Sequence, residues 1–254
     1  MFMQKIQEEV KKDMIRHPTG IIEVVYEPGK TTLTAADEEL LAAFIKLKDF
    51  EQQMKETADN LYHECQPVKE TIDELREELK GVKTSFDACS GLADKLSEPS
   101  YVFEETSLDK VTSARDKTEE LLRINNLKLE ELYQKVSVIQ DKINEYNAAN
   151  ENRLDTLFEE YNKLSMEHLE NPENNSIDAA HFDQQFDEFR SFRSELDSRR
   201  TILIEDCQQV VNEYATLNLE TSVVYNTWNE FMKRFDLLHA LSDLHNKATG
   251  FTAN

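Results

Sequence analysis

The sequence contains few residues that interrupt regular secondary structure. Its 254 residues include five Gly and five Pro, whereas charged residues make up 31%. Sheets with many tight turns need more Gly and Pro than this, and a high content of charged residues is typical of long helices. The composition therefore predicts an all-α protein.

Positive charge is also scarce. The chain carries 29 Lys and Arg against 51 Asp and Glu, which gives a formal net charge of −22. Such a surface repels the phosphates of nucleic acids and of anionic lipids. We therefore expect no nucleic-acid partner.

The groupings of residues that enzymes and metal sites need are missing from the sequence. Six His residues are scattered without helical metal spacing, and no His and Cys cluster has the spacing of a zinc site. Cys65, Cys89 and Cys207 fall at apolar positions of the pattern described below, so we interpret them as core residues. We expect a protein that is not an enzyme, with no metal and no cofactor.

Neither a signal peptide nor an apolar run of membrane-spanning length is recognisable. The cysteines also lack the paired spacing of a disulfide framework. These absences predict a reducing, cytoplasmic location.

One stretch has the outline of a nucleotide-binding motif. Residues 21–32, IIEVVYEPGKTT, run from a β-branched segment into Gly-Lys-Thr-Thr, as a P-loop does. A P-loop needs Gly at the position of Val24, and Pro28 removes a backbone donor. We interpret the stretch as a Pro-Gly turn that leads into a helix, with Thr34 and Asp37 as its capping box.

A heptad pattern of apolar residues predicts the first long helix. From Leu33 an apolar residue recurs at every seventh position as far as Leu96, and a companion row lies four residues after most of these. The register does not change across Pro67, which indicates one kinked helix. The seam that we assign to the core and to a dimer contact includes Leu40, Phe44, Leu47, Met54 and Leu61 on this helix, and Trp228 and Phe231 further along the chain.

Two further heptad segments follow. The second begins after residues 97–106 and contains a stutter near residue 150, and the third extends from about 177 to about 247. Three such helices with short connections pack side by side in antiparallel order. We predict an elongated, BAR-like coiled-coil domain over 34–247, preceded by a segment and linker over 1–33 and followed by a tail over 248–254.

Polar residues interrupt the seams at one level. Glu51 on the first helix and Arg193 on the third lie at similar distances from their helix starts, and Asn150 and Arg153 on the second lie near the same height. We hypothesise a polar layer in which Glu51 pairs with Arg193 and fixes the register of the helices.

The first 17 residues differ from the remainder in carrying a net charge of +1. Phe2, Met3, Ile6, Val10 and Met14 fall on one helical face, and Lys5, Lys11 and Lys12 lie mostly elsewhere. This pattern favours an amphipathic helix in a membrane interface. A helix packed on the bundle or a disordered start would be the alternative.

Two stretches resemble motifs of the BAR domain of the sorting-nexin type. NRLDTLFEEYNKL, at 152–164, is similar to the family's second-helix pattern, and VVNEYATLNLETSVVYNTWNEF, at 210–231, is similar to its aromatic-rich last helix. The resemblance implies an antiparallel dimer that senses or stabilises curved endosomal membranes through basic residues. The candidate basic patch here consists of Arg190, Arg193, Arg199 and Arg200. Because basic residues are few, the charge favours recruitment of the protein to its membrane by a partner protein, or by a basic partner in a heterodimer.

A cytoskeletal cross-linker of two spectrin-like repeats is the competing interpretation. It would divide the chain into five helices, at 34–66, 67–96, 107–169, 177–217 and 220–247. Continuous heptad register across both proposed reversals favours the BAR-like interpretation. An acidic chaperone for basic proteins would account for the net charge alone.

Overall fold

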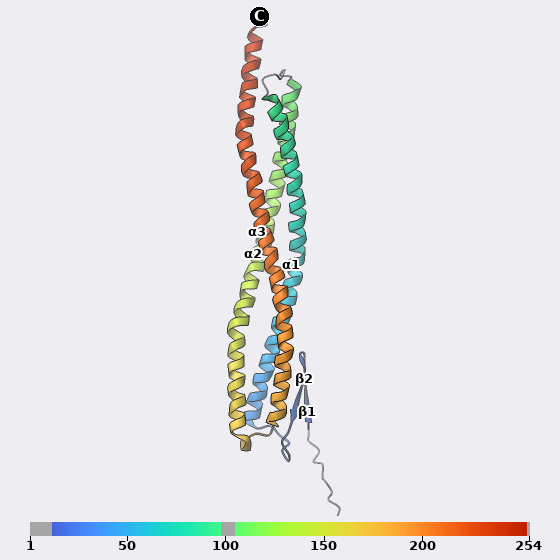
Figure 1. The fold of residues 1–254 in the computed structure, drawn as a ribbon, viewed down its shortest axis with the longest axis vertical. Helices are drawn as coiled ribbons and strands as arrows, with labels where there is room; N and C mark the ends of the chain where they lie inside the picture. The colour runs from blue at the N-terminus through green and yellow to red at the C-terminus, as the bar shows by residue number, and fades with distance from the viewer. Residues whose placement is uncertain (1–11, 98–104, 253–254) are drawn as a thin grey trace, which may run out of the picture. The chain divides into compact units, whose positions relative to one another are not determined.

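The structure, a computed structural model, describes residues 12–97 and 105–252 (Figure 1). It contains strands β1 (Lys12–His17) and β2 (Gly20–Val25) and the helices α1 (Ala35–Leu96), α2 (Glu105–Glu170) and α3 (Ala179–Thr252), with a short 3-10 helix at Pro172–Asn174. The predicted all-α class with three long helices is confirmed. None of the described helices is both long enough and apolar enough to cross a membrane.

The helix boundaries decide between the two divisions of the chain. α1 continues through Pro67, and α3 continues through residues 217–222. The five-helix division that a two-repeat rod requires is therefore wrong. α3 also ends at Thr252, beyond the predicted end near residue 247, because the sequence between them has no proline to stop it.

The chain forms two compact units, each of which contains part of every long helix. Unit 1 comprises Met1–Glu64 and Gln140–Gln208, and unit 2 comprises Cys65–Ile139 and Gln209–Asn254. Within each unit α2 is antiparallel to α1, and α3 is parallel to α1. In unit 2, for example, Glu78 pairs with Lys128 and Ser85 with Thr118, so the numbers rise on α1 and fall on α2.

Aromatic side chains fill the core of unit 1. Phe44 on α1 lies 5.3 Å from Phe182 and 5.5 Å from Phe189 on α3, measured between ring centroids, and Tyr161 on α2 stacks on Phe186 at 3.9 Å. In unit 2 the rings of Trp228 and Phe231 are packed against Phe86. All the predicted seam residues are buried: Leu40, Phe44, Leu47, Met54, Leu61, Trp228 and Phe231.

This burial corrects one part of the seam prediction. We expected a second copy to cover part of the seam at Phe44 and Leu47, but within the single chain these residues are only 1% and 0% exposed. Their own α2 and α3 leave no surface there for a partner, so these two residues cannot form a dimer contact.

A β-hairpin replaces the predicted N-terminal helix over residues 12–17. β1 and β2 pair antiparallel from Lys12 opposite Val25 to His17 opposite Gly20. Because side chains alternate along a strand, Ile15 lies opposite the buried Ile22 while Lys12 and Met14 face solvent. The helical prediction is therefore wrong for Lys12 and Met14. Its other residues lie outside the described part of the chain: Phe2, Met3, Lys5, Ile6, Val10 and Lys11.

The Pro-Gly turn and the capping box are both confirmed. The Lys30 N–H donates to the Glu27 carbonyl at 3.0 Å, and Gly29 has φ of 82°, as a type II turn with Pro at its second position requires. Thr34 donates its hydroxyl to Asp37 Oδ2 at 2.8 Å, and Asp37 N–H donates to the Thr34 hydroxyl at 3.2 Å.

Asp37 also fastens the connection between α2 and α3 to the start of α1. Its carboxylate accepts the backbone N–H groups of Ser176, at 2.9 Å, and of Ile177, at 3.3 Å. Burial by itself would raise the pKa of Asp37, but the hydrogen bonds from Thr34, Ser176 and Ile177 together lower this pKa below its ordinary value. Asp37 is consequently a fully buried carboxylate whose charge is satisfied.

Candidate functional site

The predicted polar layer is present in unit 1. Arg193 Nε lies 2.7 Å from Glu51 Oε1, which confirms the predicted pair. A second guanidinium, that of Arg200, binds Glu51 Oε2 and also Asp197. Glu51 and Arg200 are 1% and 3% exposed, so this is a buried ion network and not a surface salt bridge.

The second helix contributes less to this layer than we expected. Arg153 lies with its guanidinium 5.5 Å from the ring centroid of Phe50 and has no ion pair to the layer among the described residues. Asn150 lines a hollow beside Asp197, and its Oδ1 is buried without a hydrogen bond to any described group. α1 and α3 therefore supply the charged groups of the layer.

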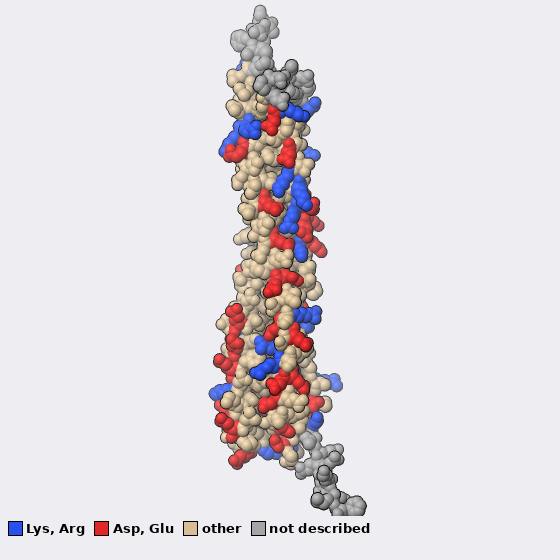
Figure 2. Space-filling model, viewed as in Figure 1, with Lys and Arg blue, Asp and Glu red and all other residues tan. Residues whose placement is uncertain are grey.

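The network also changes the interpretation of the predicted basic patch. Arg193 and Arg200 point into unit 1, and Arg190 lies over the Phe186 ring at 5.4 Å. Only Arg190 and Arg199 are exposed among the four arginines. Figure 2 shows Lys and Arg scattered among Asp and Glu on the face in view, without one large basic surface.

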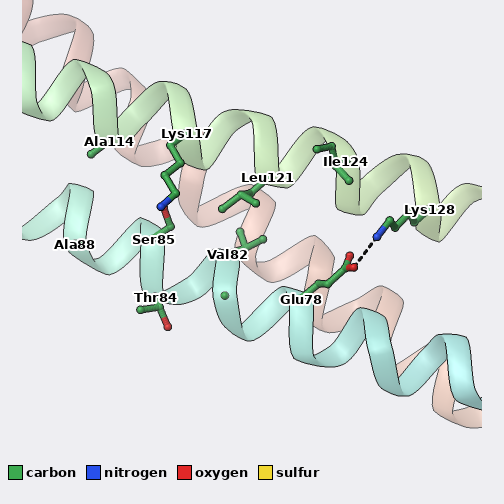
Figure 3. A pocket seen from close by; sticks show the side chains of 11 residues that line it. Glu78, Val82, Thr84, Ser85, Ala88, Ala114, Lys117, Leu121, Ile124 and Lys128 are labelled. Atoms are coloured by element: carbon green, nitrogen blue, oxygen red, sulfur yellow. Dashed lines mark hydrogen bonds and ion pairs between the residues drawn. The ribbon is translucent and has the colours of Figure 1, made fainter.

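A groove lies between α1 and α2 in unit 2, where the heptad pattern had predicted no concave surface (Figure 3). It has a volume of about 770 Å³ and is mainly apolar, with Val82, Leu121 and Ile124 among its lining residues. Lys128 donates to Glu78 across one end of the groove at 2.5 Å, and Lys117 extends toward Ser85 from the opposite helix.

Small residues on α1 create this groove. Gly81, Ser85 and Ala88 follow one another at spacings of four and three, which places them on one face of the helix. A Cβ atom added at Gly81 would meet no other atom within 4 Å, so the surface above it is open. This run of small residues was the signal in the sequence that could have indicated the groove, because small side chains let another helix approach closely.

An exposed apolar row lies on α3 in the same unit. Leu237, Leu241 and Leu244 are 63%, 53% and 63% exposed and repeat at spacings of four and three. Arg234 pairs with Asp94 near the end of α1, and α3 continues past that point (Figure 1). We call these three leucines the α3 leucine row.

The candidate surfaces described above are suited to binding. Among them there is no group of three or more His, Cys, Asp or Glu side chains placed to hold a metal ion. Their grooves and rows are suited to packing against another helix, in the way that amphipathic helices bind apolar grooves.

Comparisons with known proteins do not assign the chain to a family. No family model matches the sequence, and no curated protein matches it. One solved structure that is similar is a computationally designed three-helix bundle, which has 11% sequence identity and a TM-score of 0.28 over 78% of this chain and 98% of that chain.

Proposed function

We propose that this protein is a non-enzymatic, dimeric helical scaffold in which the unit 2 groove of one copy receives the α3 leucine row of another. The observation that supports this proposal most directly is the open, apolar groove over Gly81, Ser85 and Ala88. A helical row of exposed leucines is the kind of surface that such a groove accepts.

The groove and the row match in length and chemistry. The small residues span eight residues, from Gly81 to Ala88, and the leucine row also spans eight residues, from Leu237 to Leu244. At 1.5 Å per residue, both surfaces are about 10 Å long. Each copy offers one groove and one row, so a twofold-symmetric pair would form the same contact twice.

A role in membrane trafficking extends this proposal. It is supported by the two sequence stretches that resemble sorting-nexin BAR domains. Since Arg193 and Arg200 are engaged by Glu51, we propose that a protein partner, and not a basic face of unit 1, brings the scaffold to its membrane. Attachment through the apolar residues before Lys11 stays a prediction.

Disulfide cross-linking tests the dimer contact. One tagged chain carries Gly81→Cys, and a differently tagged chain carries Leu241→Cys. The native cysteines are 0–1% exposed and give a low background. We expect a cross-link between the two different chains under mild oxidation.

The matched control replaces Gly81→Cys with Gly91→Cys. Gly91 is an equally open glycine on α1 but lies outside the groove. Equal cross-linking yields from the two positions would contradict the proposal, as would cross-links confined to Leu241→Cys pairs.

A further inference from the structure

Lys48 on α1 is a buried lysine without a carboxylate partner. It is 7% exposed, and among the described residues it forms no ion pair and no side-chain hydrogen bond. Its Nζ lies 5.3 Å from the ring centroid of Phe44 and 5.2 Å from that of Phe189. Lysine is rarely buried without a partner, because the removal of an ammonium group from water is costly.

The two rings offset only part of this cost. Cation–π contacts stabilise an ammonium group, yet an aromatic ring is a much weaker acceptor for its N–H donors than a carboxylate. Burial accordingly lowers the pKa of Lys48. An anion that reached the Nζ would supply a charged acceptor.

Lys48 lines a second groove, which lies in unit 1 between the hairpin and α3. The groove has a volume of about 400 Å³. Ile21 and Phe192, both exposed apolar side chains, line it from β2 and from α3. The lining also contains polar side chains, those of Thr19, Gln184 and Gln185, so the groove is both polar and apolar.

The outer edge of β2 presents backbone groups to this groove. Val25 C=O accepts the Asp178 N–H at 2.7 Å, and the side-chain amide of Gln185 accepts the Glu23 N–H at 2.7 Å while donating to the Glu23 C=O. Because backbone groups alternate in direction along a strand, the N–H and C=O of Ile21 face the same side as those of Glu23. Ile21 is thus the next position at which an added chain could pair.

We propose that this groove binds an extended peptide segment of a partner protein, with an acidic side chain of the segment on Lys48 and its backbone paired with Ile21. Apolar side chains beside the acidic one would contact Ile21 and Phe192. This combination of an unpaired cation, an open strand edge and flanking apolar residues is what an extended acidic peptide requires.

The charges around the groove favour a single carboxylate over a more highly charged anion. Glu23 is already paired with Lys12 at 3.1 Å, and His181 Nε2 lies 3.6 Å from the same carboxylate oxygen. Glu188 also lines the groove and accepts a hydrogen bond from Gln184. A phosphate dianion would meet stronger repulsion from Glu23 and Glu188 than a single carboxylate, whose one charge Lys48 can balance.

NMR titration of the isotopically labelled full chain tests the inference. The probes are the peptides Ac-Val-Glu-Val-NH2 and Ac-Val-Gln-Val-NH2, and sodium acetate serves as a free carboxylate. We expect saturable shifts of the Ile21 amide and of the Gln185 side-chain amide with the Glu peptide. The Gln peptide should bind about tenfold more weakly, because it lacks the charge-assisted hydrogen bond.

Two variants separate a role of Lys48 in binding from a general effect on the fold. Lys48→Met keeps the length of the side chain and removes the buried charge, and it should abolish the preference for the Glu peptide. Lys46→Met is the matched control, since Lys46 pairs with Glu160 outside the groove, and it should leave the preference intact.

Three results would overturn the inference. The first is the absence of saturable shifts with the Glu peptide at millimolar concentration. The second is an unchanged preference in Lys48→Met. The third is acetate binding as tightly as the Glu peptide, which would assign the site to free carboxylates. None of these results bears on the dimer contact, because that contact lies in unit 2.

Discussion

Arg193 on α3 holds its Nε 2.7 Å from Oε1 of Glu51 on α1, at a level of unit 1 where Glu51 is 1% exposed. Arg200, seven residues later on α3, binds the other carboxylate oxygen of Glu51. A shift of α3 by one turn would leave at least one of these charges buried without a partner. The network therefore specifies the register of α1 and α3 in this unit.

Removal of the shared carboxylate should be costly. Among the described residues, Glu51→Leu leaves Asp197 as the one ion-pair partner of the Arg200 guanidinium, which is 3% exposed. We expect the free energy of unfolding to fall by about 3 kcal/mol, because an uncompensated buried charge remains. Urea unfolding followed by circular dichroism measures the change.

A second substitution identifies the arginine whose unpaired charge causes most of the loss in the free energy of unfolding. Arg200→Leu in the Glu51→Leu background should restore most of the lost stability. Arg193→Leu should restore less, because the side chain of Arg193 is 19% exposed and water can solvate its charge, whereas that of Arg200 is 3% exposed. A loss below about 1 kcal/mol for Glu51→Leu alone would mean that water solvates the arginines.

The sequence pattern predicted this layer only in part, for a physical reason. Counting residues from the helix starts placed Glu51 near Arg193, since helix rise is regular. Two arginines seven residues apart on α3 can both reach one carboxylate, and residue counting does not say which of them is more deeply buried. The helices and the Thr34 cap were predicted well because heptads and capping boxes are local signals.

Asp37 should make stability depend on acid pH. Its hydrogen bonds hold the pKa of the folded state below the ordinary value of 3.8 despite burial. The stabilisation is therefore fully present above about pH 5 and is lost as the pH falls through 3.8 toward the lower pKa of the folded state. Urea unfolding of the native chain and of Asp37→Asn at several pH values measures this effect.

The difference in the free energy of unfolding between the native chain and Asp37→Asn isolates the effect of Asp37, since the other carboxylates titrate in both proteins. We expect Asp37→Asn to be less stable by about 1–2 kcal/mol at pH 7, because a charged acceptor for the Thr34, Ser176 and Ile177 groups is lost. The difference should shrink below about pH 4. A difference that stays constant down to pH 3 would contradict this assignment.

The cysteines should be inert in the folded protein. Burial raises the pKa of Cys89 to about 11, although the charge of Arg115 opposes the shift. At pH 8 its thiolate fraction would be roughly 0.1%, and Cys65 and Cys207 are 1% and 0% exposed. We expect a thiol reagent such as Ellman's reagent to react slowly with the native chain up to pH 9. In urea, where the chain is unfolded, it should react rapidly with all three thiols. One rapidly reacting thiol in the native chain would show that a core position opens.

The hairpin and the grooves were beyond the reach of sequence reasoning. The segment KDMIRH fits a helical face and an alternating strand about equally well, and its pairing with β2 decided the outcome. Gln185 completes the edge of β2 from 162 positions away in the chain. The run of small residues on α1 was a local signal for the unit 2 groove, but the α2 residues that complete its lining lie opposite only in the folded chain.

The most direct test of the scaffold proposal is sedimentation velocity of the native chain, of Gly81→Leu and of Gly91→Leu. The native chain and Gly91→Leu should sediment as dimers. Gly81→Leu should dissociate into monomers with an affinity about 10- to 100-fold weaker, because its side chain occupies the space that the leucine row needs. A monomeric native chain at tens of micromolar, or a Gly81→Leu dimer as tight as that of Gly91→Leu, would contradict the proposal.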